Sequence, residues 1–100
     1  MTMKIKELRI QKADNAALSI SWTLSDGRQT AYELFLIREG CVVDGVKMSS
    51  GLTSCTLHTT PELMKEYDIL LTVTAGAKLT TARAGFRIDK KAQLYLCVSY

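Results

Sequence analysis

Polar and apolar residues alternate along much of this chain, most cleanly in two segments. Residues 17–25 place serine and threonine on one side, and the other side is made by Leu18, Ile20, Trp22 and Leu24. Residues 67–75 repeat the pattern, with an apolar face made by Tyr67, Ile69, Leu71, Val73 and Ala75. A side-chain period of two with one apolar face is typical of a strand that covers a core on one side. Both segments are therefore predicted to be half-buried strands.

Turn signals separate these segments from other strand-like runs, and turns are expected at Asp14-Asn15, around Gly27, at Glu39-Gly40 and at Gly76. The predicted strands are residues 3–10, 17–25, 30–38, 42–48, 54–59, 67–75 and 79–88. Residues 42–48 are read either as one short strand or as a hairpin, because Asp44-Gly45 between valines is a strong turn signal. About seven short antiparallel strands without a convincing helix predict an all-β, immunoglobulin-like sandwich of two sheets.

Tyr67 opens its strand directly after a loop at residues 61–66. This placement predicts a tyrosine corner, in which the phenol OH hydrogen-bonds to upstream backbone and fixes the turn between two sheets. Trp22, Tyr32 and Tyr67 each lie in phase with the apolar face of their strand. All three are therefore expected to be structural core residues rather than a platform for stacking a ligand.

Trp22 on the second strand, Tyr32 on the third and Tyr67 at the head of the sixth resemble a fibronectin type III domain over about residues 3–88. The resemblance implies that these aromatic side chains form the centre of the core between the sheets. We expect a β-sandwich domain over residues 1–88 and a strand-like tail over residues 89–100. The tail is expected to fold back as an extra strand, to pair with another copy, or to begin a further domain.

A narrower resemblance lies in residues 18–22, Leu-Ser-Ile-Ser-Trp, followed by residues 28–34, Arg-Gln-Thr-Ala-Tyr-Glu-Leu. These two strands are similar to the N-terminal β-sandwich of bacterial α-L-rhamnosidases, although Val43 stands where those proteins often carry tryptophan. The resemblance implies a non-catalytic accessory module of a multidomain glycoside hydrolase. It also implies that the catalytic carboxylates belong to a separate helical barrel. The alternative is a stand-alone domain that binds carbohydrate or another protein.

The charge and hydropathy of the chain bear on its possible partners, and its cysteines bear on its compartment. The net charge of +3 gives no clustered basic face for nucleic acid, and no apolar run approaches the roughly 20 residues of a membrane span. Lys4, Lys6, Arg9 and Lys12 are expected along a solvated strand edge. The odd, widely spaced cysteines Cys41, Cys55 and Cys97 favour reduced, buried thiols over a disulfide. Reduced cysteines and a first segment unlike a signal peptide favour the cytoplasm.

The residues with catalytic potential are few, and we expect no enzyme, no cofactor and no metal site in this chain. Glu62 and Glu66 form the nearest carboxylate pair, but they share a charged loop with Lys65. His58 is expected to be solvated, and it lies three positions from Cys55, which places the two on opposite faces of a strand. A nucleophile dyad is therefore not expected.

An interaction face is the one functional feature that the pattern predicts. Phe35 and Ile37 lie on the side of their strand opposite Tyr32, and Leu70 lies opposite Tyr67. Third and sixth strands are neighbours in this fold, so the three should cluster outside one sheet, near Val43. We expect this face to contact a neighbouring domain of a larger protein or a second copy. Phe35, Tyr95 and Tyr100 are the aromatic residues open to a carbohydrate partner.

Overall fold

The computed structural model describes residues 4–14, 16–25 and 28–99, without the side chains of residue 14 and residues 96–99. Within these ranges the chain forms eight strands and no helix. A three-stranded sheet has the order β1 (Ile5–Asp14), β2 (Ala17–Leu24) and β5 (Ser54–Leu57). A five-stranded sheet has the order β4 (Cys41–Met48), β3 (Ala31–Arg38), β6 (Glu66–Ala75), β7 (Lys78–Ile88) and β8 (Leu94–Ser99).

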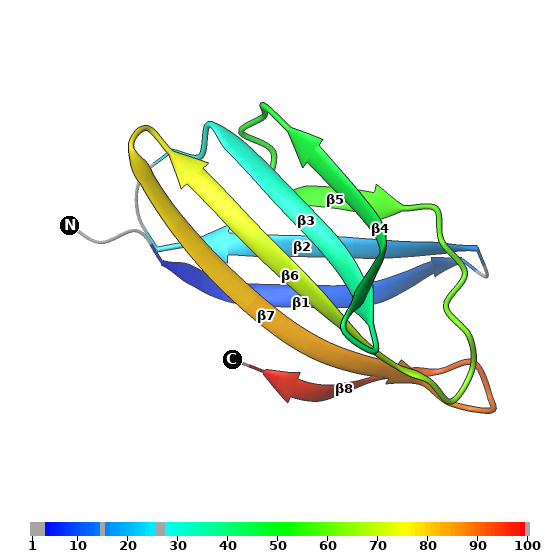
Figure 1. Ribbon diagram of the computed structural model, residues 1–100. Helices are drawn as coiled ribbons and strands as arrows, with labels where there is room; N and C mark the ends of the chain where they lie inside the picture. Colours follow the sequence, from blue (N-terminus) through cyan, green and yellow to red (C-terminus); the bar gives the residue numbers. More distant parts are fainter. Residues whose placement is uncertain (1–3, 15, 26–27, 100) are drawn as a thin grey trace.

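The two sheets face each other, and the strands of one run obliquely across those of the other (Figure 1). Every neighbouring strand pair is antiparallel. The predicted all-β sandwich is confirmed. The strand bounds differ by a few residues: β1 runs on to Asp14, and β5 already ends at Leu57. Met3, at which the first strand was predicted to begin, lies outside the described residues.

The core lies between the two sheets. It is filled by the apolar side chains that alternate with polar ones along each strand. The apolar side chains of β2 and β6 point inward as predicted, and Leu18, Ile20, Ile69, Leu71 and Val73 are completely buried. Each such side chain contributes about 1.5–3 kcal/mol when it leaves water. β7 adds Phe86 and Ile88, and its small residues Ala82 and Ala84 complete the apolar layer.

The three predicted core aromatics are buried, but they do not share the centre of the core. The rings of Trp22 and Tyr32 meet edge-on, with centroids 5.0 Å apart. Tyr67 instead stacks on Phe86 at 5.5 Å. Tyr32 lies opposite Val73, six positions along β6 from Tyr67. At about 3.4 Å per residue the two tyrosines are about 20 Å apart, so aliphatic side chains fill the middle.

Hairpin turns follow the expected backbone rules. Glu39 and Gly40 both have positive φ, 52° and 79°, as a two-residue type I′ turn requires. Gly76 joins β6 to β7 with φ of 63°. Asn15 and Gly27, at which two further turns were predicted, lie outside the described residues.

Asp44-Gly45 does not form the turn that the dipeptide suggested. β4 runs straight through it, and Asp44 and Gly45 pair with Leu36 and Phe35 of β3. The register shifts between Leu36 and Ile37, so β4 carries a bulge near Val43. The hairpin alternative was wrong because the Glu39-Gly40 turn already reverses the chain and leaves the next eight residues to pair with β3.

The C-terminal segment pairs with β7 as an eighth strand along the edge of the five-stranded sheet (Figure 1). The turn before it is organised by Asp89, whose carboxylate accepts hydrogen bonds from the backbone N–H groups of Lys91 and Gln93 at 3.0 and 2.8 Å. The ammonium group of Lys12 donates to the carbonyl of Ala92 at 2.9 Å. This contact ties β1 to the β7–β8 connection and closes one side of the sandwich.

Candidate interaction face

The outer side of the five-stranded sheet brings together three apolar side chains from two neighbouring strands. Phe35 of β3 lies directly opposite Leu70 of β6. Ile37 lies two positions further along β3, opposite Asp68. All three apolar side chains are partly exposed. We call Phe35, Ile37 and Leu70 the outer patch; they are the residues that the alternation placed on this face.

Gly45 determines how the Phe35 ring lies. A Cβ at Gly45 would stand 2.8 Å from Cδ1 of Phe35, closer than carbon atoms approach without a shift. The ring therefore lies over the bare backbone of β4, a cross-strand pairing of an aromatic residue with glycine. An open hollow of about 360 Å³ beside it is lined by residues that include Val42 and Val43. These two valines are 58% and 48% exposed, so they extend the apolar surface to the sheet edge.

Charged residues around the outer patch face residues of opposite charge. Asp68 binds Arg83 through Oδ2 and Nη2 at 2.5 Å. Glu33 lies opposite Lys47, and Glu66 lies opposite Arg87. The exposed Asp68–Arg83 ion pair contributes only about 0–1 kcal/mol, and the other two pairs are cross-strand neighbours of opposite charge. The outer patch is therefore apolar and bordered by charges of both signs.

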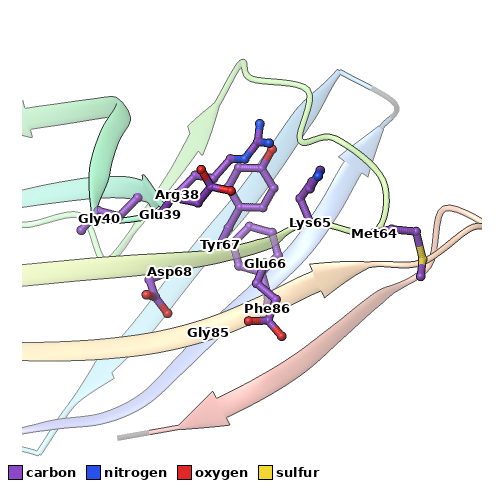
Figure 2. A pocket seen from close by; sticks show the side chains of 11 residues that line it. Arg38, Glu39, Gly40, Met64, Lys65, Glu66, Tyr67, Asp68, Gly85 and Phe86 are labelled. Carbon is purple, nitrogen blue, oxygen red and sulfur yellow. The ribbon is translucent and has the colours of Figure 1, made fainter.

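A second hollow, of about 450 Å³, lies between the β3–β4 turn and the start of β6 (Figure 2). Tyr67 on its wall makes the predicted tyrosine corner: its phenol oxygen accepts the backbone N–H of Glu62 at 2.9 Å. The Glu62 side chain also pairs with Arg38, Oε2 to Nη1, at 2.9 Å. Glu62 is thus contacted at its backbone by Tyr67 and at its carboxylate by Arg38.

The residues considered for catalysis lie in different surroundings. Glu62 is committed to Arg38, Glu66 is exposed at the start of β6, and His58 is exposed just after β5 as expected. Within the described residues, no group of three or more His, Cys, Asp or Glu side chains is placed to hold a metal ion. In the same part of the chain, none of the elements is a helix with the length and apolar character needed to cross a membrane.

The described cysteines are free thiols in different settings. Cys55 is half-buried, and burial raises the pKa of its thiol against the lowering effect of its hydrogen bond with Tyr32. Burial, followed by the interaction with Cys55, also raises the pKa of the Tyr32 phenol. Cys41 is exposed, contrary to the expectation of buried thiols, because it begins an edge strand. The side chain of Cys97 lies outside the description.

Gln29 is a buried polar residue whose role the alternation did not predict. Its side-chain oxygen accepts the indole N–H of Trp22 at 2.8 Å. Its amide nitrogen donates to the carbonyls of Ser50 and Leu52 at 2.9 and 2.6 Å. The side chain thereby joins the β2–β3 and β4–β5 connections around Trp22. A buried indole needs an acceptor, and that need is the signal that could have identified Gln29.

Comparisons with known sequences return no relative: no family model matches this chain, and no curated protein matches it. The α-L-rhamnosidase resemblance is therefore not confirmed. Comparisons with solved structures do return matches. The three described below share at most 16% of their residues with this chain, so they establish the fold alone.

Three solved structures illustrate the likeness. A computationally redesigned β-sandwich protein has a TM-score of 0.65 and 16% identity, covering 86% of this chain and 94% of that one. The FN1–FN3 domains of chicken CNTN1 have a TM-score of 0.59 and 15% identity, covering 84% and 30%. The β-D-glucuronidase of Dictyoglomus thermophilum has a TM-score of 0.56 and 14% identity, covering 95% and 18%. The fold is thus a fibronectin-type β-sandwich, and this chain spans less than a third of the two larger proteins.

Proposed function

We propose that this chain is a non-catalytic accessory module of a larger protein, and that it packs against a neighbouring domain through the outer patch. One observation carries the proposal: Phe35, Ile37 and Leu70 are contiguous, apolar and partly exposed, inside a rim of oppositely charged neighbours. Apolar surface rimmed by polar residues marks interaction sites. Matches that align with parts of multidomain chains support a module of this kind.

We further infer that the parent protein is a glycoside hydrolase resembling the bacterial α-L-rhamnosidases. The inference rests on the similarity of residues 18–22 and 28–34 to strands of those enzymes. A match to a small part of a glucuronidase is compatible with it. In this proposal catalysis belongs to another domain, and Glu62 and Glu66 take no part in it.

A stand-alone carbohydrate-binding domain is the second candidate. Tyr95 favours it, because this ring is 48% exposed on β8 opposite Arg87, and exposed aromatic rings are the usual contacts for sugars. Tyr100, the other terminal candidate, lies outside the described residues. Titration with rhamnose-containing oligosaccharides separates the two candidates when the NMR line widths of Tyr95 and Phe35 are followed. Broadening that saturates as the oligosaccharide concentration rises supports the carbohydrate function, and unchanged line widths contradict it.

The deciding experiment uses the complete open reading frame that encodes this chain. Ile37→Glu should loosen the packing of the module on its neighbour, seen as a larger radius of gyration in solution scattering and faster proteolysis between domains. Ser21→Glu, on the other outer face of the sandwich, is the matched control and should change neither. An Ile37→Glu protein that keeps its domain arrangement and loses only thermal stability would contradict the proposal.

A further inference from the structure

The two long, free sheet edges at β1 and β4 are protected in different ways. β1 and the residue before it carry the exposed cations Lys4, Lys6 and Arg9, as expected for a guarded edge. β4 begins instead with three exposed, uncharged residues, Cys41, Val42 and Val43. An uncharged, apolar stretch on an edge strand is a template for pairing with another chain. The charged residues of β4, Asp44 and the exposed Lys47, follow this stretch.

Asp44 lies next to these residues and is bonded on both carboxylate oxygens. Oδ1 accepts the backbone N–H of Gly45 at 2.8 Å. Oδ2 accepts the hydroxyl of Thr59, which belongs to the connection that follows β5. The carboxylate therefore occupies one backbone donor of β4 and holds a segment of the opposite sheet's connection against this strand.

We propose that Asp44 prevents β4 from pairing with β4 of a second copy of this chain. Two identical strands that pair antiparallel about a two-fold axis form a self-complementary contact, and every copy presents the same edge. An axis near the middle of β4 would bring two Asp44 carboxylates close together, and like charges across a strand pair are destabilising. This inference concerns the sheet edge and does not depend on the outer patch.

Sedimentation velocity over a concentration series tests the proposal. Asp44→Ala should self-associate on the order of tenfold more tightly than the unaltered chain, equivalent to about 1.4 kcal/mol. Glu7→Ala is the matched control, because it also removes one negative charge from an edge strand, β1, and leaves both β4 and the outer patch intact. It should behave like the unaltered chain.

Two further measurements place the contact. Amide exchange of Asp44→Ala should slow at residues 42–46 as the concentration rises. Adding Val43→Lys should restore the original self-association, because a lysine on an edge discourages strand pairing. The proposal is wrong if folded Asp44→Ala associates no more than the unaltered chain, or if Val43→Lys fails to reverse the association. If Asp44→Ala does not fold, Asp44→Asn is judged by the same criteria, since its side-chain oxygen still accepts a hydrogen bond.

Discussion

The outer faces of the two sheets carry different chemistry on the same strand geometry. On the three-stranded sheet, the outward residues of β2 and β5 are Ser19, Ser21, Thr23, Ser54 and Thr56. On the five-stranded sheet, the central rows hold Phe35, Ile37 and Leu70. Both sheets turn apolar side chains inward. Core packing therefore explains the inner faces, which are alike, but not the outer faces, which differ. The difference between the outer faces is not required by core packing, and it is the basis for proposing the outer patch as the docking face.

The largest expected effect comes from the shared inner faces. Trp22→Ala should lower the free energy of unfolding by about 3–5 kcal/mol, because it removes a buried ring and opens a cavity between the sheets. It also leaves the Gln29 oxygen without its donor. Denaturant unfolding measures the loss. Ser21→Ala on the outer side of the same strand is the control, and an equal loss there would break the distinction between inner and outer faces.

A smaller effect is expected at the connection between the sheets. Tyr67→Phe keeps the ring stacked on Phe86 but deletes the phenol oxygen that accepts the Glu62 amide. Stability should fall by about 1 kcal/mol, the usual net contribution of one hydrogen bond. Thermal unfolding of the variant beside Tyr95→Phe, whose phenol is exposed, provides the comparison. A larger loss of stability in Tyr95→Phe than in Tyr67→Phe would show that the Tyr67 corner is not the important hydrogen bond.

Exchanging the two outer faces should cost still less stability. Leu70→Thr makes the five-stranded face resemble the other one, and Ser21→Val does the reverse; each is expected to change unfolding free energy by about 0.5 kcal/mol, as surface substitutions do. The interaction readout should differ. Leu70→Thr should weaken docking within the complete parent protein, whereas Ser21→Val should leave it unchanged. Equal weakening by both would show that the outer patch is not specific.

The smallest expected effect is a dependence of stability on pH. It comes from Cys55 and Tyr32, whose side chains lie on the inner faces of the sheets. Folding raises the pKa of Cys55 and of Tyr32, chiefly by burial, so the unfolded chain loses these protons at lower pH than the folded one. Their contribution is complete below the unfolded pKa values and is lost as the pH rises through the folded ones. Stability should therefore fall on the alkaline side. Cys55→Ala should make this alkaline decline shallower, as measured by urea unfolding at a series of pH values. If the decline in unfolding free energy is unchanged in the variant, other groups cause it.

Much of the fold could be predicted because the alternation within each strand shows which of its sides is buried. Residues 17–25 and 67–75 alternate so regularly that their buried sides were evident, and Tyr67 after its loop predicted the corner that Glu62 completes. Asp44-Gly45 misled because dipeptide turn preferences are local. Whether a chain turns there depends on the register that a partner strand imposes.

The sequence by itself determined which side of each strand is apolar, and with it the sandwich, the buried aromatics and the outward direction of Phe35, Ile37 and Leu70. Tertiary structure alone decided what meets across the strands. It laid Phe35 over Gly45, joined Trp22 to two connections through Gln29, paired Arg38 with Glu62 and set Asp44 against Thr59. Side-chain direction follows from a period of two within one segment, whereas these contacts join segments whose spacing depends on sheet order and register.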